Sequence, residues 1–101
     1  MNIIARGTLL IYVSKYPLAE TALLNWYQEF VKASYQNFNQ LKAVYGNASI
    51  VANDRVIFNI KGNDFRLITS INFNRQAAYI IWFGTDAEYD RIDAANIKFI
   101  L

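Results

Sequence analysis

The second half of the chain contains three segments of β-branched and aromatic residues that are separated by very short connectors. The segments run from Arg55 to Ile60, from Phe65 to Phe73 and from Ala77 to Phe83, and the connectors read KGND and NRQ. Residues of these types favour strands, and connectors of this length join neighbouring antiparallel strands as hairpins. This half of the chain therefore predicts a meander of three to four antiparallel strands.

The first half predicts helices that pack on this sheet. The expected elements are a short strand over Asn2–Ala5 and helices over Leu9–Tyr16, Leu18–Lys32 and from Asn37 to about Gly46. The segment Leu9–Tyr16 would also serve as a strand, but Leu9, Val13 and Tyr16 recur at helical spacing and Pro17 ends the run. The fold class expected is α+β, with N-terminal helices on a twisted antiparallel sheet and a short C-terminal helix.

The length and composition suit one compact domain over residues 1–101. Hydrophobic residues make up 54% of the chain and charged residues 18%, so a core can form and disorder is not expected. No apolar stretch approaches the roughly 20 residues that cross a bilayer. The N-terminal apolar run lacks a small-residue cleavage site, so we interpret it as part of the domain rather than as a signal peptide.

The chain contains neither histidine nor cysteine. Disulfides, thiolate chemistry and catalytic triads built on imidazole are therefore excluded, and a transition-metal site would need an unusual set of oxygen ligands. Any acid–base chemistry has to come from carboxylates, tyrosine, lysine or a water held by the backbone.

A polar segment follows the last predicted strand and begins a helix expected over Asp86–Ile92. Thr85 followed by Glu88 fits a capping box, and Tyr89 lies three residues after Asp86 on the same helical face.

Residues 86–93 carry a charge of −3, from four acidic residues against one arginine, which leaves +5 on the other 93 residues because the chain carries +2. A moderately basic body of this kind suits a polyanionic partner. Residues 94–101 are expected to form a tail or an edge strand.

Several short motifs follow one another in a recognisable order. They are LKAVY at residues 41–45, NIxGN at 59–63, FRLI at 65–68 and GTxAEYD at 84–90, and they follow a helical segment around Trp26. Over nearly its whole length, the chain resembles the HigB-type toxins of the RelE superfamily. The resemblance implies the toxin of a bacterial type II toxin–antitoxin pair: a cytoplasmic endoribonuclease that cleaves mRNA on the translating ribosome and is silenced by a HigA-like antitoxin. It implies no membrane, and no metal or organic cofactor, because this cleavage uses the RNA's own 2′-hydroxyl.

The resemblance also assigns candidate roles to individual residues. Arg66 would contact the scissile phosphate, and Tyr89 would orient a base or donate a proton. The alternative interpretations are a solvent-facing strand arginine and a tyrosine that anchors the helix. The candidate catalytic residues are Asp86, Arg66 and Tyr89, and the candidate RNA-binding residues are Lys42, Lys61 and Arg75, for which ordinary surface cations are the alternative.

Asp86 stands where the family characteristically has histidine. RNA cleavage by the 2′-hydroxyl needs a base for that proton and an acid for the leaving 5′-oxygen. Imidazole serves in either role near neutral pH, whereas an aspartate carboxylate is a weaker base and, when ionised, repels the phosphodiester. We therefore expect a nuclease whose activity is attenuated or lost, through natural divergence or through replacement of a toxic residue. The alternatives are a non-catalytic protein that binds antitoxin, RNA or the ribosome, and an unrelated α+β scaffold.

Overall fold

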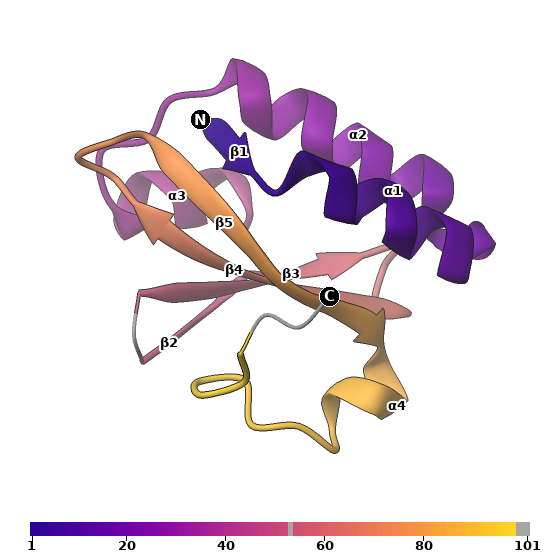
Figure 1. Ribbon diagram of the computed structural model, residues 1–101. Coiled ribbons are helices and arrows are strands. Elements are labelled where there is room, and N and C mark those ends of the chain that lie inside the picture. Colours follow the sequence, from indigo (N-terminus) through magenta and orange to yellow (C-terminus); the bar gives the residue numbers. More distant parts are fainter. Residues whose placement is uncertain (53, 99–101) are drawn as a thin grey trace.

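A computed structural model describes residues 1–52 and 54–98 of the chain (Figure 1). Along these residues the elements are β1 (Asn2–Ile4), α1 (Arg6–Lys15), the 3-10 turn η1 (Pro17–Ala19), α2 (Glu20–Lys32), α3 (Phe38–Val44), β2 (Ser49–Val51), β3 (Arg55–Ile60), β4 (Phe65–Asn72), β5 (Ala77–Thr85) and α4 (Asp86–Tyr89). The α+β class is confirmed.

The sheet is mixed and has the strand order β1-β5-β4-β3-β2 among the described residues. The predicted antiparallel meander is confirmed as β3, β4 and β5. The prediction of a purely antiparallel sheet with three to four strands is wrong, because β1 adds to β5 in the parallel direction and β2 adds to β3. Both additional strands are only three residues long, too short for a clear periodic pattern. The partner of β2 follows it directly in the chain, whereas that of β1 lies some 75 residues away.

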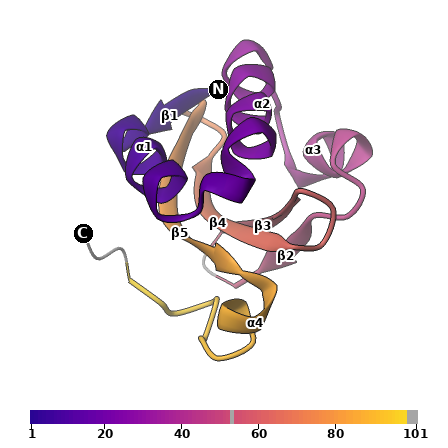
Figure 2. The ribbon, with the colours of Figure 1, turned by 90° about the vertical axis from the view of Figure 1, so that its right-hand side faces the viewer.

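Helices α1 and α2 lie on one face of the sheet, and α3 lies beside α2 (Figures 1 and 2). The α2 side chains Leu23, Trp26 and Phe30 are buried in the core between these layers, as their helical spacing predicts. The expected helix over Leu9–Tyr16 is confirmed and begins earlier, at Arg6. The helix expected from Leu18 begins instead at Glu20, after a short 3-10 turn that starts at Pro17.

The C-terminal segment lies on the opposite face of the sheet (Figure 1). The expected helix over Asp86–Ile92 is shorter than predicted and ends at Tyr89, because the amides of Arg91 and Ile92 bond three residues back and tighten the chain into turns. Arg55 holds the following segment by donating from Nη1 to the Ala94 carbonyl at 2.8 Å. Residues 94–98 form no strand, and the last part of the expected tail or edge strand, residues 99–101, lies outside the described residues.

Two negative findings concern the described ranges 1–52 and 54–98. No helix in them is long and apolar enough to cross a membrane. No group of three or more acidic side chains in them is close enough to hold a metal ion.

Candidate functional site

Strand pairing brings the arginine of β4 next to the end of β5. Arg66 pairs with Gly84, two residues before Asp86. The neighbouring Phe65 is buried on the helical side, with its ring 5.7 Å from that of Tyr16, so the alternation of the strand directs Arg66 to the opposite face. The amide of Asp86 donates to the Asp64 carbonyl at 2.9 Å, which ties the start of α4 to the β3–β4 connector.

The Arg66 guanidinium is held by three kinds of contact. Its Nη2 lies 2.8 Å from Oδ1 of Asp86 in an ion pair. Its Nη1 donates to the carbonyls of Asn63 and Phe65 at 2.9 and 3.1 Å. Its central carbon lies 6.0 Å from the centre of the Tyr89 ring, within cation–π range. The candidate catalytic residues Arg66, Asp86 and Tyr89 therefore meet in one cluster.

The absence of a side chain at Gly84 lets an aromatic ring pack beside this cluster. The Trp82 ring lies against Gly84, where an added Cβ would stand 2.6 Å from its Cη2 and Cζ2 atoms. The same tryptophan ring lies 6.3 Å from that of Tyr89. Because only glycine leaves room for this ring, Gly84 sets the position of Trp82 beside Tyr89, the aromatic residue that lies near Arg66.

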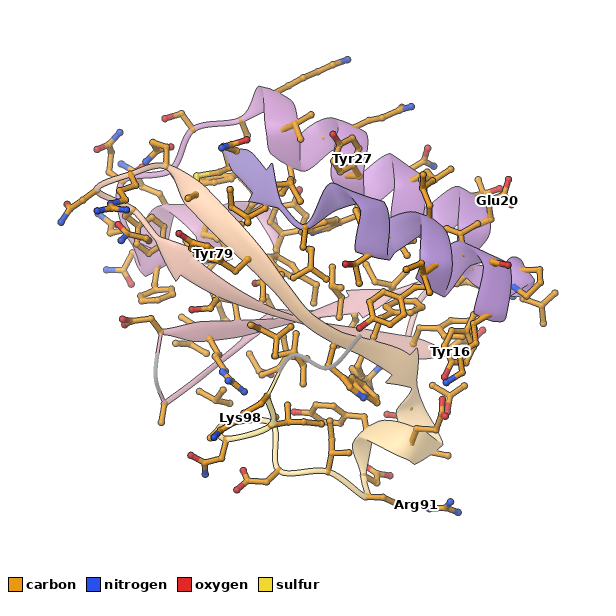
Figure 3. All side chains as sticks on the ribbon, viewed as in Figure 1. Tyr16, Glu20, Tyr27, Tyr79, Arg91 and Lys98 are labelled. Carbon is orange, nitrogen blue, oxygen red and sulfur yellow. The ribbon has the colours of Figure 1, made fainter. Side chains whose placement is uncertain are left out.

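The start of α4 is fixed by the predicted capping box and by a long-range contact. Glu88 accepts from the Thr85 amide at 2.8 Å, and the Glu88 amide donates to the Thr85 hydroxyl at 3.1 Å. The same carboxylate oxygen of Glu88 accepts from the Tyr16 hydroxyl at 2.8 Å. Figure 3 shows Tyr16 at the end of α1, near α4. Contacts from the helical layer, as well as from the sheet, therefore hold the site in position.

These hydrogen bonds shift the ionisation of both partners. The Thr85 amide, and to a lesser extent the Tyr16 hydroxyl, lower the pKa of Glu88 against the opposing effect of burial. Burial, reinforced by the Glu88 carboxylate, raises the pKa of Tyr16 to about 12. Near neutral pH the pair therefore consists of a neutral phenol that donates and an ionised carboxylate that accepts.

A groove of about 470 Å³ runs beside Asp86. Lys61 lines it and pairs with Asp64, with Nζ and Oδ2 3.8 Å apart. The remaining lining residues are Leu18, Asn63, Phe65, Thr85, Asp86 and Ala87. The groove is thus open to a ligand and carries charged groups of both signs next to the Arg66 cluster.

Comparison with known proteins assigns this arrangement to a family. Residues 19–92 match the HigB toxin family, described as the RelE-like toxic component of a toxin-antitoxin system. The chain belongs to the HigB toxin family. It is also 28% identical over 98 residues to the mRNA interferase toxin HigB of Escherichia coli K12, and equally to the mRNA interferase HigB of Escherichia coli O157:H7 and of Shigella flexneri. Each alignment covers 95% of this chain and 94% of the relative. An unrelated scaffold is therefore excluded.

Two candidate RNA-binding residues of this HigB-family chain lie outside the groove. Lys42, on α3, donates from its ammonium group to the Ala48 carbonyl. Arg75 lies in the β4–β5 turn, at the other end of β4 from Arg66, which a strand of this length places about 20 Å away. Of the three predicted RNA contacts, only Lys61 lines the groove beside Asp86.

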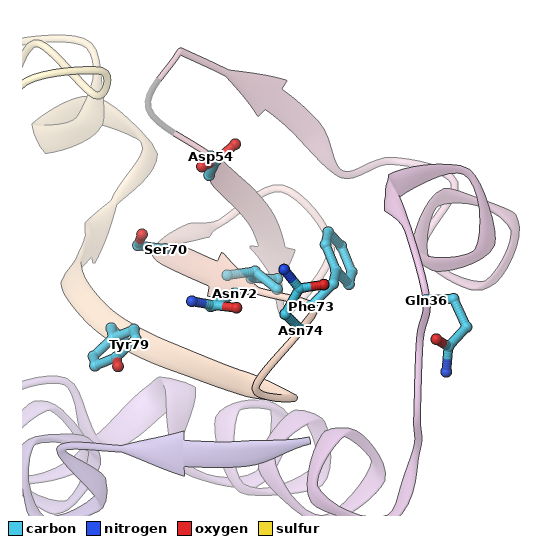
Figure 4. Close-up of a pocket in the computed structure, with 8 residues that line it drawn as sticks. Gln36, Asp54, Ser70, Asn72, Phe73, Asn74 and Tyr79 are labelled. Atoms are coloured by element: carbon cyan, nitrogen blue, oxygen red, sulfur yellow. The ribbon is translucent and has the colours of Figure 1, made fainter.

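A larger hollow of about 540 Å³ lies at the far end of the sheet (Figure 4). Its lining residues are Gln36, Asp54, Ser70, Ile71, Asn72, Phe73, Asn74 and Tyr79. They include no lysine or arginine, so this hollow offers no cation to a phosphate. The groove beside Asp86 is the better candidate for an RNA site.

Three parts of the HigB-family site were not predicted from the sequence. Tyr16 lies 72 positions before Glu88, and no local pattern connects the two. Asn63 contributes its backbone carbonyl to Arg66, which any residue type supplies. The sequence does show a glycine, Gly84, directly after the aromatic run of β5, but its role is visible only once the position of the Trp82 ring is known.

Proposed function

We propose that this chain is an mRNA endoribonuclease, the toxin of a type II toxin–antitoxin pair. The observation that carries the proposal is the convergence of Arg66, Asp86 and Tyr89, with the arginine and the aspartate 2.8 Å apart and the aspartate lining an open groove. The relatives named as mRNA interferases support the choice of substrate.

The cleavage chemistry needs a phosphate binder, a base and an acid. Arg66 would bind the scissile phosphate and stabilise the charge that develops on it, since a guanidinium matches phosphate oxygens with paired N–H donors. Tyr89 would orient the base or supply a proton. Asp86 occupies the family's histidine position and would be a poor base, so we propose that the native chain cleaves slowly or not at all.

The biological setting follows from the same proposal. A HigA-like antitoxin would silence the protein, and the substrate would be mRNA on the ribosome, in the cytoplasm. Lys61 would contact RNA within the groove, whereas Lys42 and Arg75 would contact only RNA or ribosomal segments that lie outside it. Residues 1–101 would act as one domain, without a metal or organic cofactor.

Replacement of Asp86 by histidine tests the proposal. Induced expression of Asp86→His should arrest growth and cleave reporter mRNA in a translation extract, and co-expression of the cognate antitoxin should relieve both effects. The double variant Asp86→His with Arg66→Ala should be harmless, because the phosphate binder is lost while the histidine remains. A folded Asp86→His variant that leaves growth and reporter mRNA intact would refute the nuclease proposal.

A second candidate function is a non-catalytic protein that binds antitoxin, RNA or the ribosome. The observation that favours it is the ion pair of Asp86 with Arg66, which ties the side chain at the family's histidine position to a cation. Two results together would support this function: a pull-down retains the antitoxin or ribosomes, and the Asp86→His variant is inert.

A further inference from the structure

Each cation of the Arg66 cluster and its groove has a carboxylate partner. Arg66 pairs with Asp86 at 2.8 Å, and Lys61 pairs with Asp64 at 3.8 Å. Two positive and two negative side chains sum to zero, so these four residues offer an RNA phosphate no net attraction. The net positive charge of the chain, +2, therefore comes from residues other than these four.

The contacts of Arg66 leave one edge for an external anion. Both contacts of Nη1 go to backbone carbonyls, of Asn63 and Phe65, and the Tyr89 ring lies near the guanidinium. Asp86 engages the remaining terminal nitrogen, Nη2. Carboxylate and phosphate oxygens accept from a guanidinium in the same way, so they compete for this edge.

We propose that the Asp86 carboxylate occupies the anion site of Arg66 and that an RNA phosphate binds there only by displacing it. This inference rests on the proposed function for the choice of RNA, and it concerns binding rather than proton transfer. Asp86 acts as an internal competitor that weakens the affinity of the native chain for the RNA backbone.

The structure allows the displacement without a change of fold. The Asp86 side chain is 49% exposed, whereas that of Arg66 is only 15% exposed. The backbone of Asp86 is held separately, by the hydrogen bond that its amide donates to the Asp64 carbonyl and by the capping box that starts α4. Rotation of one side chain into solvent therefore frees the arginine while the arginine itself stays in place.

The test measures binding of a short 2′-O-methyl RNA, which cannot be cleaved through its 2′-hydroxyl. Asp86→Asn should bind this RNA about fivefold to tenfold more tightly than the native chain, as expected for release of one partly buried ion pair. The matched control is Asp90→Asn, which removes the same charge from an exposed side chain four residues after Asp86 that neither lines the groove nor pairs with Arg66. The control should change the affinity by less than about twofold.

A double-variant cycle assigns the gain to Arg66. In an Arg66→Ala background, Asp86→Asn should improve RNA affinity no more than Asp90→Asn does. Asp86→Ala should reproduce the gain of Asp86→Asn if the native fold is kept, which urea unfolding verifies. Equal gains from Asp86→Asn and Asp90→Asn, or weaker binding by Asp86→Asn, would overturn the inference. Neither result affects the nuclease proposal, which depends on cleavage by Asp86→His.

Discussion

The Tyr16 hydroxyl donates a hydrogen bond of 2.8 Å to the Glu88 carboxylate, which lies 72 positions later in the chain. The same oxygen of Glu88 also accepts from the Thr85 amide, so one atom joins the end of α1 to the start of α4. Asp86 and Tyr89 stand on either side of Glu88 in sequence. The Tyr16–Glu88 contact therefore positions the short helix that carries two of the three candidate catalytic residues.

Removal of the Tyr16 hydroxyl should destabilise the protein modestly. We expect Tyr16→Phe to lower the free energy of unfolding by about 1 kcal/mol, because a hydrogen bond to a charged acceptor is lost at a partly exposed position. The measurement is urea unfolding at neutral pH. The matched control is Tyr79→Phe, which deletes the same hydroxyl from a ring that is 37% exposed and remote from α4. Equal losses in the two variants would contradict the role given to the Tyr16–Glu88 bond.

Acid should weaken the native protein partly through Glu88. Its pKa in the folded state is lowered, first by the Thr85 amide, so the ionised form stabilises the fold. That contribution is present above the ordinary glutamate pKa of 4.5 and is lost as the pH falls through the lowered value. Unfolding free energies measured from neutral pH downward should therefore fall less steeply for Glu88→Gln than for the native chain. Identical slopes would show that Glu88 makes no such contribution.

Alkali should act on the other partner of the same bond. The folded-state pKa of Tyr16 is about 12 against an ordinary value of 10.0, so the protonated phenol stabilises the fold. Its contribution is complete below the ordinary value and is lost as the pH rises through about 12. The pKa values of Tyr12 and Tyr45 are also raised, so these two phenols should titrate late together with Tyr16. In an ultraviolet titration of the folded protein, Tyr16→Phe should therefore remove one phenol from this late-titrating group. Loss of an early-titrating phenol instead would contradict the assignment.

The sequence predicted the elements with strong local signals, but it missed the three-residue strand β2 and the distant partner of β1. The hairpins β3–β4 and β4–β5 follow from residue types and connector length alone. The parallel pairing of β1 is set by remote contacts: the Asn2 amide donates to the Gln76 carbonyl at 2.7 Å, and the Gln76 side chain donates to the Tyr35 carbonyl. No periodicity in residues 2–4 encodes the identity of that neighbour.

The same distinction explains the candidate site. Side chains alternate along a strand, so Arg66 opposes the buried Phe65, and helical spacing predicted that Tyr89 shares a face with Asp86. The ion pair between Arg66 and Asp86 was not predicted, because it depends on the register that aligns Arg66 with Gly84. Lys42, Lys61 and Arg75 have equivalent side-chain charges, so only the fold separates the one in the groove from the other two.

Gly84 gives the last prediction, which links packing to the site. An added Cβ would lie 2.6 Å from two atoms of the Trp82 ring, and such a contact forces the ring to move. We expect Gly84→Ala to cost about 1–3 kcal/mol of unfolding free energy, as overpacking of a closed contact does, and to change the tryptophan fluorescence of the folded protein. The matched control is Gly46→Ala, where nothing lies within 4 Å of the added atom.

Because the displaced Trp82 ring neighbours Tyr89, which in turn neighbours Arg66, Gly84→Ala placed in the Asp86→His background should also reduce mRNA cleavage. Unchanged fluorescence and cleavage in a folded Gly84→Ala variant would separate Trp82 from the function of the site.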